Sequence, residues 1–250
     1  LQSPGPFTVF APTDDAFAKL PKGTVETLLK PENKGKLQSI LLYHVVPGKM
    51  MASDVLAAPG LVTANGQRLD VSAKGGPKVD NSKIIITDIK TSNGVIHVID
   101  AVALPNSKSI PEVAAEAGTF KTLLAAAKAG GMVEALSGKG PITVFAPTDE
   151  AFAKLPDGTI EYLLKPENKA ALVDILSYHV VPGRVYSDAA VKAGSAETLQ
   201  GSSAKIAVRS GKAFVNESQI VATDIDASNG VVHVVDAVML PPKMADASNN

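Results

Sequence analysis

The sequence has no cysteine among its 250 residues, and this absence excludes several ways of stabilising or equipping a fold. Without thiols the chain can form no disulfide bond and can hold no metal through thiolates. An extracellular location is compatible with the absence but is not indicated by it. No stretch approaches the roughly 18 consecutive apolar residues of a membrane-spanning helix, so the sequence predicts no membrane insertion.

An excess of charge of one sign is also lacking, because 24 Lys and Arg residues face 25 Asp and Glu residues and leave a formal net charge of −1. Nucleic-acid binding needs a basic surface, and so does adsorption to anionic lipid. We therefore expect neither partner. Hydrophobic residues make up 45 % of the chain and charged residues 20 %, a composition typical of folded soluble domains. The length allows two ordinary domains with separate cores.

The most informative feature that is present is a repeat. Residues 8–50 align without gaps to residues 143–185, and 32 of these 43 positions are identical. The offset is 135 at the segment "YHVVPG" and 136 at "SNGVIHVIDAVALP" against "SNGVVHVVDAVMLP". The chain is therefore read as two copies of one domain, joined in the turn-rich stretch "LPNSKS". We predict a first domain over 1–105, a second over 106–242 and a tail over 243–250.

The two copies differ in what precedes them. The second follows an Ala- and Leu-rich segment with helical spacing, interrupted at Gly130–Gly131, which predicts a helix pair over residues 110–137. The first copy is preceded only by "LQSPGP". If both copies share a fold, the first lacks its helix pair in this chain, and the equivalent helices are either removed or supplied by another molecule. Any secretion signal is expected to lie outside the given residues.

Within each copy the pattern predicts short helices followed by an antiparallel sheet, an α+β, β-rich domain. The segment "TVFAPT" predicts a strand, and the residues after it suit a helix start: a Thr as N-cap followed by acidic residues. "LVTANGQRLDVS" and the two apolar runs joined by "TSNG" predict hairpins. Four histidines fall in two equivalent pairs, and we interpret them as partly buried side chains that bond backbone carbonyls. The structural positions that we single out are Thr13, Asp14, Thr148, Asp149, His97 and His233.

The sequence supports a metal-binding or catalytic role for these residues less well than a structural role. The two histidines of each copy come from different elements, and nothing in the sequence places carboxylates beside both, as a zinc site would require. There is no Gly-x-Ser-x-Gly elbow. The acidic pairs at the two helix starts could be acid–base groups, but their position is explained by the helix dipole. We expect no catalytic residue, no metal and no cofactor.

Three segments together carry a resemblance. "TVFAPTDDAF", "LLYHVVPG" and "GVIHVIDAVALP", in this order in both copies, resemble the signature segments of the fasciclin domain family. The resemblance implies two compact, wedge-shaped β-sandwiches flanked by short helices, each normally opened by a helix pair. It also implies a secreted or cell-surface location, a role in adhesion and no enzymatic activity. In animal matrix members an Asp-Ile pair and the Tyr-His motif are linked to integrin binding. The matching candidate binding residues here are Asp88, Ile89, Asp224, Ile225, Tyr43, His44, Tyr178 and His179.

The Asp-Ile pairs lead into turns, where functional residues are common. They also have a plain structural interpretation, in which Ile ends a strand and Asp caps the turn. We therefore expect an extracellular or cell-surface adhesion or structural module that contacts protein or glycan. Self-assembly is an open alternative, because an incomplete first copy would expose apolar surface that a neighbouring copy could cover and so build a filament. The other alternative is a binding module for a small hydrophobic or carbohydrate ligand.

Overall fold

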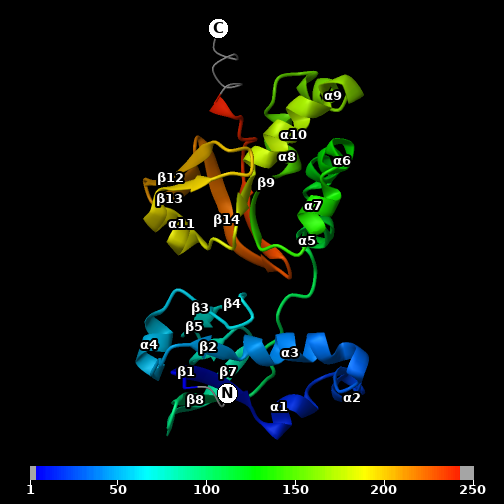
Figure 1. The fold of residues 1–250 in the computed structure, drawn as a ribbon. Coiled ribbons are helices and arrows are strands. Elements are labelled where there is room, and N and C mark those ends of the chain that lie inside the picture. The colour runs from blue at the N-terminus through cyan, green and yellow to red at the C-terminus, as the bar shows by residue number, and fades with distance from the viewer. Residues whose placement is uncertain (1–3, 243–250) are drawn as a thin grey trace. The chain divides into compact units, whose positions relative to one another are not determined.

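The computed structural model describes residues 4–242, and the chain divides into two compact units after Asn106 (Figure 1). We call the units domain 1 and domain 2 and describe each by itself. The predicted tail over 243–250 lies outside the described residues. Within them, no helix is both long and apolar enough to cross a membrane.

Domain 1 consists of short helices and a mixed sheet. Its elements are β1 (Phe7–Pro12), α1 (Asp14–Ala18), α2 (Thr24–Leu28), the 3-10 turn η1 (Pro31–Asn33), α3 (Lys34–Tyr43), β2 (Val45–Pro47), α4 (Ala52–Ala57), β3 (Leu61–Val62), β4 (Arg68–Leu69), β5 (Val71–Ser72), β6 (Lys78–Val79), β7 (Ser82–Thr91) and β8 (Gly94–Ile99).

The main sheet of domain 1 has the strand order β2-β1-β8-β7-β6-β5, and β3 pairs separately with β4. Both predicted hairpins are present, with β3 antiparallel to β4 and β7 antiparallel to β8. The strands that follow the helices pair antiparallel, as predicted, and β1 joins this sheet parallel to β8, a pairing that the sequence analysis did not predict. This pairing brings the first and last strands of the domain side by side, and local alternation patterns carry no signal for it.

Domain 2 repeats this order after three additional helices. Its elements are α5 (Ile110–Ala117), α6 (Lys121–Gly130), α7 (Val133–Ser137), β9 (Ile142–Pro147), α8 (Asp149–Ala153), α9 (Thr159–Leu163), η2 (Pro166–Asn168), α10 (Lys169–Tyr178), β10 (Val180–Pro182), α11 (Ser187–Ala193), β11 (Ser195–Glu197), β12 (Ser203–Arg209), β13 (Lys212–Val215), β14 (Ser218–Ala227) and β15 (Gly230–Val235). The strand order is β10-β9-β15-β14-β13-β12-β11, again with a parallel pair, β9 and β15.

The segment predicted as a helix pair forms three helices, α5 to α7, because two left-handed glycines break it. Ser109 precedes α5, and its backbone N–H donates to Glu112 Oε2 at 2.7 Å in a capping box. Gly118 ends α5 with φ of 73°, and Gly131 ends α6 with φ of 72°, a conformation that glycine adopts without steric cost. A short third helix then follows. The helical spacing in the sequence predicted where the helical region lies, but not that it is divided into three helices.

The cores of the two domains correspond only in part. A cluster around Phe10, Tyr43 and Val55 fills domain 1 on one side of its sheet. The equivalent cluster in domain 2 surrounds Phe145 and Tyr178. Domain 2 has a second cluster on the other side, where α5, α6 and α7 pack on β9, β15 and α10 (Figure 1). Among the described residues, domain 1 has no counterpart of this second cluster.

Candidate functional site

The tyrosine of each Tyr-His motif lies in the core rather than at the surface. Tyr43 is 4 % exposed, and its hydroxyl donates to Arg68 O at 3.0 Å or to Asp80 Oδ2 at 2.9 Å. Tyr178 is also buried. Its hydroxyl oxygen lies 3.3 Å from Ser203 O and accepts a hydrogen bond from Asn216 Nδ2 at 2.9 Å. In this fold neither phenol is accessible to a partner, and both connect the end of a helix to a neighbouring strand or turn.

The histidine of the same motif joins a helix end to the segment that follows the last strand of its domain. His44 Nδ1 lies 2.8 Å from Ile40 O, and its Nε2 accepts the Ala103 N–H at 3.1 Å. His179 repeats these contacts with Ile175 O and Met239 N–H. An imidazole that donates through Nδ1 and accepts through Nε2 is neutral. Each ring therefore links two segments of its own domain.

Burial keeps these rings neutral. Desolvation lowers the pKa of His179 to about 4, opposed only by its bond to the Ile175 carbonyl. Desolvation lowers the pKa of His44 as well. A general acid or base needs a pKa near the working pH, and neither histidine has this property at neutral pH.

The second histidine of each copy lies in the main core. His97 is fully buried beside the Phe10 ring, accepts the Asp88 N–H through Nδ1 at 3.3 Å and contacts Met50 O through Nε2 at 3.0 Å. His233 makes the same contacts with Asp224 N–H and Val185 O. Burial lowers the pKa of His233. These histidines use the opposite tautomer to those of the Tyr-His motifs and hold a bulged strand to the loop before α4 or α11.

The Asp-Ile pairs lie at bulges of β7 and β14, where each Asp has a φ of 61°. Asp88 Oδ1 accepts the Ala52 N–H at 2.9 Å, and Asp224 Oδ1 accepts the Ser187 N–H at 2.7 Å. Both carboxylates thus hold the first turn of a helix that lies earlier in the chain, α4 for Asp88 and α11 for Asp224. Ile89 is 41 % exposed. In Asp88–Ile89 the isoleucine therefore offers the free apolar surface, and the aspartate is committed to the fold.

The pair in domain 2 is less open than its counterpart. Ile225 is partly buried against the helical cluster. Asp226, the next residue, accepts from Arg184 Nη1 at 2.5 Å and from the Tyr186 hydroxyl at 2.9 Å. Burial and the Asp226 charge raise the pKa of Tyr186. A binding role for either Asp-Ile pair stays a prediction.

The two helix starts after β1 and β9 differ in what their acidic residues contact. Thr13 and Thr148 are N-caps, each accepting a backbone N–H three residues on at 3.1 Å. Asp149 also accepts the backbone N–H groups of Thr122 at 2.7 Å and Lys121 at 3.3 Å, and so caps the N-terminus of α6. These bonds lower its pKa. Asp14 occupies the same position in domain 1, and its side chain is exposed.

No cluster of three or more His, Asp or Glu side chains suited to a metal ion occurs in the described part of the chain. The donor chemistry agrees with this, because the ring nitrogens of all four histidines are engaged with backbone groups.

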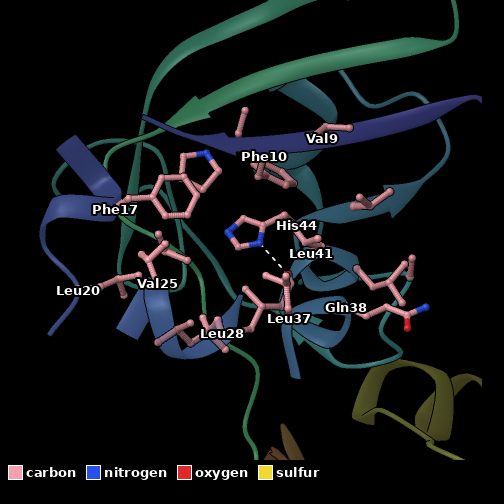
Figure 2. Close-up of a pocket in the computed structure, with 18 of the residues that line it drawn as sticks. Val9, Phe10, Phe17, Leu20, Val25, Leu28, Leu37, Gln38, Leu41 and His44 are labelled. Atoms are coloured by element: carbon pink, nitrogen blue, oxygen red, sulfur yellow. Dashed lines mark hydrogen bonds between the residues drawn. The ribbon is translucent and has the colours of Figure 1, made fainter. Parts of the chain in front are cut away.

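Domain 1 has an apolar groove of about 880 Å³ on the face of the sheet opposite its core. Figure 2 shows its walls: Phe17, Val25 and Leu28 line one side, and Leu37 and Leu41 of α3 line the other. Val9 of β1 contributes to the groove. His44 and Gln38 are the polar side chains among the lining residues. No set of polar groups converges in the groove to orient a sugar.

In domain 2 the equivalent surface is covered. Leu41 is 57 % exposed, whereas its equivalent Leu176 is 5 % exposed beneath the added helices. Phe17 is 42 % exposed and its equivalent Phe152 is 7 % exposed. Asn229 secures both ends of the cover, because its Oδ1 accepts the Ile110 N–H at 2.9 Å and its Nδ2 donates to Leu136 O at 2.8 Å. We define the domain 1 groove as the candidate site.

The sequence analysis anticipated exposed apolar surface on the first copy, but it did not name the residues of the groove. The sequence does contain a pattern that predicts the groove residues. Phe17 and Leu41 recur as Phe152 and Leu176, and apolar residues at matching helical positions of two copies predict one shared buried face. The exposed carboxylate of Asp14 had no such signal, because Asp14 was already explained as a first-turn acid.

Comparison with known proteins agrees with this architecture. The family model of the fasciclin domain matches residues 1–105 and again residues 118–241. The chain belongs to the fasciclin domain family. Fasciclin domains are non-enzymatic, so the groove and the buried histidines are not parts of an active site.

Individual relatives of this fasciclin chain come from bacteria and animals. Protein sll1483 of Synechocystis is 52 % identical over 145 residues, which cover 58 % of this chain and 80 % of that protein. Transforming growth factor-beta-induced protein ig-h3 of Sus scrofa is 30 % identical over 246 residues, which cover 96 % of this chain. The chain spans only 35 % of the length of that animal protein.

A solved structure of two such domains in tandem is similar to this chain. A FAS1 domain pair from the insect cell adhesion molecule Fasciclin I matches with a TM-score of 0.53 at 18 % identity, over 95 % of this chain and 89 % of that one. The match supports a tandem fasciclin fold, mixed α+β and rich in strands.

Proposed function

We propose that this chain is an extracellular or cell-surface adhesion module that acts through protein–protein contact, with the domain 1 groove as a principal contact surface. Family membership supports the adhesion class, and the insect relative of similar fold is named a cell adhesion molecule. We choose the groove as the contact surface because its side chains are apolar and exposed. Large exposed apolar patches on soluble proteins mark interaction sites, and Leu41 and Phe17 lie in such a patch.

The composition of the groove favours protein over glycan. Sugar sites need polar groups placed to meet hydroxyls, in addition to apolar contact. Here both ring nitrogens of His44 are occupied by backbone groups, which leaves Gln38 as the available polar side chain of the lining. A small hydrophobic ligand remains compatible with the groove, and we keep it as the alternative function.

Filament formation by donation of helices requires an opening step. In domain 2, Leu123 and Leu136 are 7 % and 8 % exposed, packed in their own domain. They could cover a neighbour's groove only after leaving their own sheet face. Light scattering from dilute to concentrated solution checks this, and we expect no growth in mass while domain 2 stays folded.

Adhesion is tested with the purified chain coated on a surface and presented to cells, to extracted extracellular matrix and to a fluorescent copy of itself. The variant Leu41→Glu places a charge in the groove and should remove most of the binding. The control Leu56→Glu changes another exposed leucine, on α4 and outside the groove lining, and should leave binding intact. Absence of binding to every surface would contradict the proposal, and so would binding that Leu41→Glu does not change.

The Asp-Ile pairs supply a second contact surface within the same proposal. Ile85, Ile86 and Ile89 on β7 are all exposed, and they adjoin Asp88. Ile89→Ser reports on this surface in the same assay without disturbing the Asp88 bond to α4.

A further inference from the structure

Domain 2 contains a cavity beneath its helices. The cavity has a volume of about 220 Å³ and lies among α8, α9 and α10, beside the segment that follows β15 (Figure 1). We propose that this cavity is a binding site for a small, uncharged, apolar molecule with one hydrogen-bonding group, which the hydroxyl of Tyr162 contacts. All the lining residues belong to domain 2, so the proposal depends neither on the groove of domain 1 nor on the adhesion role.

The walls of the cavity are formed by side chains of the domain 2 core. Phe152 of α8, Leu163 of α9 and two residues of α10, Leu172 and Ile175, line it. Leu123 of α6 contributes to the lining from the helical cover. Apart from Leu163, these side chains are at most 7 % exposed. Close packing of core side chains holds them in place, so we expect the cavity to keep its shape without a ligand.

The volume of the cavity limits the size of the ligand. Protein interiors leave few voids larger than a water molecule, and an apolar cavity of about 150 Å³ is large enough to bind benzene. Pockets for drug-sized ligands measure about 300–1,000 Å³. A cavity of about 220 Å³ therefore suits a molecule with one ring or a short branched chain, and it is too small to receive a helix or a folded partner.

The chemistry of the lining excludes a charged ligand. Among the described residues that line the cavity, none is Asp, Glu, Lys or Arg. His179 also lines it, but burial lowers the pKa of His179 to about 4, and both ring nitrogens are bonded to backbone groups. A carboxylate or an ammonium group would therefore lose its water without gaining a counter-charge, which is costly. The ligand is neutral and mainly apolar.

Tyr162 supplies a polar contact at the mouth of the cavity. Its side chain lines the cavity although the residue is 56 % exposed, so the cavity reaches the surface beside it. A phenol hydroxyl both donates and accepts hydrogen bonds and can meet an alcohol or a carbonyl group on the ligand. The equivalent residue of domain 1 is Thr27, in an otherwise closely matching segment. The phenol is thus a feature of the second copy alone.

The test uses the full chain and three probes of similar size: benzyl alcohol, toluene and benzoate. Titrations followed by methyl NMR should show saturable shifts of the Leu163 and Ile175 signals with benzyl alcohol and with toluene. Benzoate should bind at least about 10-fold more weakly than benzyl alcohol, because its carboxylate finds no partner in the lining. Tyr162→Phe should weaken the binding of benzyl alcohol by about 2- to 10-fold, as expected for one hydrogen bond, and should leave toluene binding unchanged.

Two matched variants locate the probes. Leu155→Trp places a larger ring in the cavity and should abolish the shifts in domain 2. Leu20→Trp changes the equivalent residue of domain 1 and should leave the domain 2 signals responsive. Thermal unfolding verifies that each variant folds.

Three results would overturn the inference. The first is the absence of saturable shifts in domain 2 with both neutral probes, as expected if the void results only from loose packing or is filled by another segment of the chain. The second is benzoate binding as tight as that of benzyl alcohol. The third is an equal effect of Tyr162→Phe on benzyl alcohol and toluene, which would show that the phenol does not contact the polar group.

Discussion

Leu41 and Leu176 occupy the same position on equivalent helices of two homologous domains, yet one is 57 % exposed and the other 5 %. The difference comes from α5, α6 and α7, which cover the sheet face in domain 2. The core on the opposite face is present in both domains, with Phe10 or Phe145 beside a buried histidine. The comparison distinguishes two layers of the fold: a core that both domains contain and a helical cover that, among the described residues, only domain 2 contains.

The cover also determines which residues stabilise the fold and which are available for binding. An apolar side chain under the cover contributes its burial to folding. The same side chain without the cover leaves that free energy available for association with a partner. Matched substitutions at equivalent positions of the two domains therefore measure this division directly.

The largest effect is expected from Leu176→Ala against Leu41→Ala. Removing the side chain of Leu176 leaves a cavity beneath the helices and should lower the free energy of unfolding of domain 2 by about 3 kcal/mol. Leu41→Ala removes exposed atoms and should change domain 1 by less than about 1 kcal/mol. Hydrogen exchange resolved by peptide reports each domain separately. Equal losses in the two domains would mean that the groove of domain 1 is covered in solution.

The contrast between Leu176 and Leu41 also separates the features that can be predicted from the sequence from those that cannot. The duplication, the N-caps Thr13 and Thr148 and the hairpins follow from patterns that span few residues, and the structure contains them. The parallel pairing of β1 with β8 joins residues about ninety positions apart, for which periodicity gives no signal. The burial of Tyr43 and His44 depends on the same long-range packing. Exposure of Leu41 is decided by which segment lies over α3, and the residues of α3 do not contain that information.

The two domains should also differ in how much stability they lose at low pH. Desolvation lowers the pKa of His179 to about 4 in the folded state from 6.5 in the unfolded chain. As the pH falls below 6.5 the unfolded state binds the proton first, so the stability that neutral His179 provides is complete above pH 6.5. It is lost progressively down to about pH 4. The loss should reach about 3 kcal/mol in domain 2.

Domain 1 serves as the internal control for acid. The pKa of His44 is lowered in the same direction, but His44 is less deeply buried than His179. We therefore expect a smaller loss of stability in domain 1 over the same interval. Titration of the ring signals by NMR checks the assignment. A His179 midpoint near 6.5, or equal pH slopes in the two domains, would contradict the account.

The smallest effect, and the one most specific to the cover, is expected at the two helix-capping aspartates. Asp149→Ala removes the acceptor for the first N–H groups of α6 and should destabilise domain 2 by about 1 kcal/mol. Asp14→Ala removes only a first-turn acid from α1, and its effect on domain 1 should be smaller than that of Asp149→Ala on domain 2. Thermal unfolding followed for each domain by hydrogen exchange measures both changes, and equal losses would contradict a capping role that Asp149 has and Asp14 lacks among the described residues.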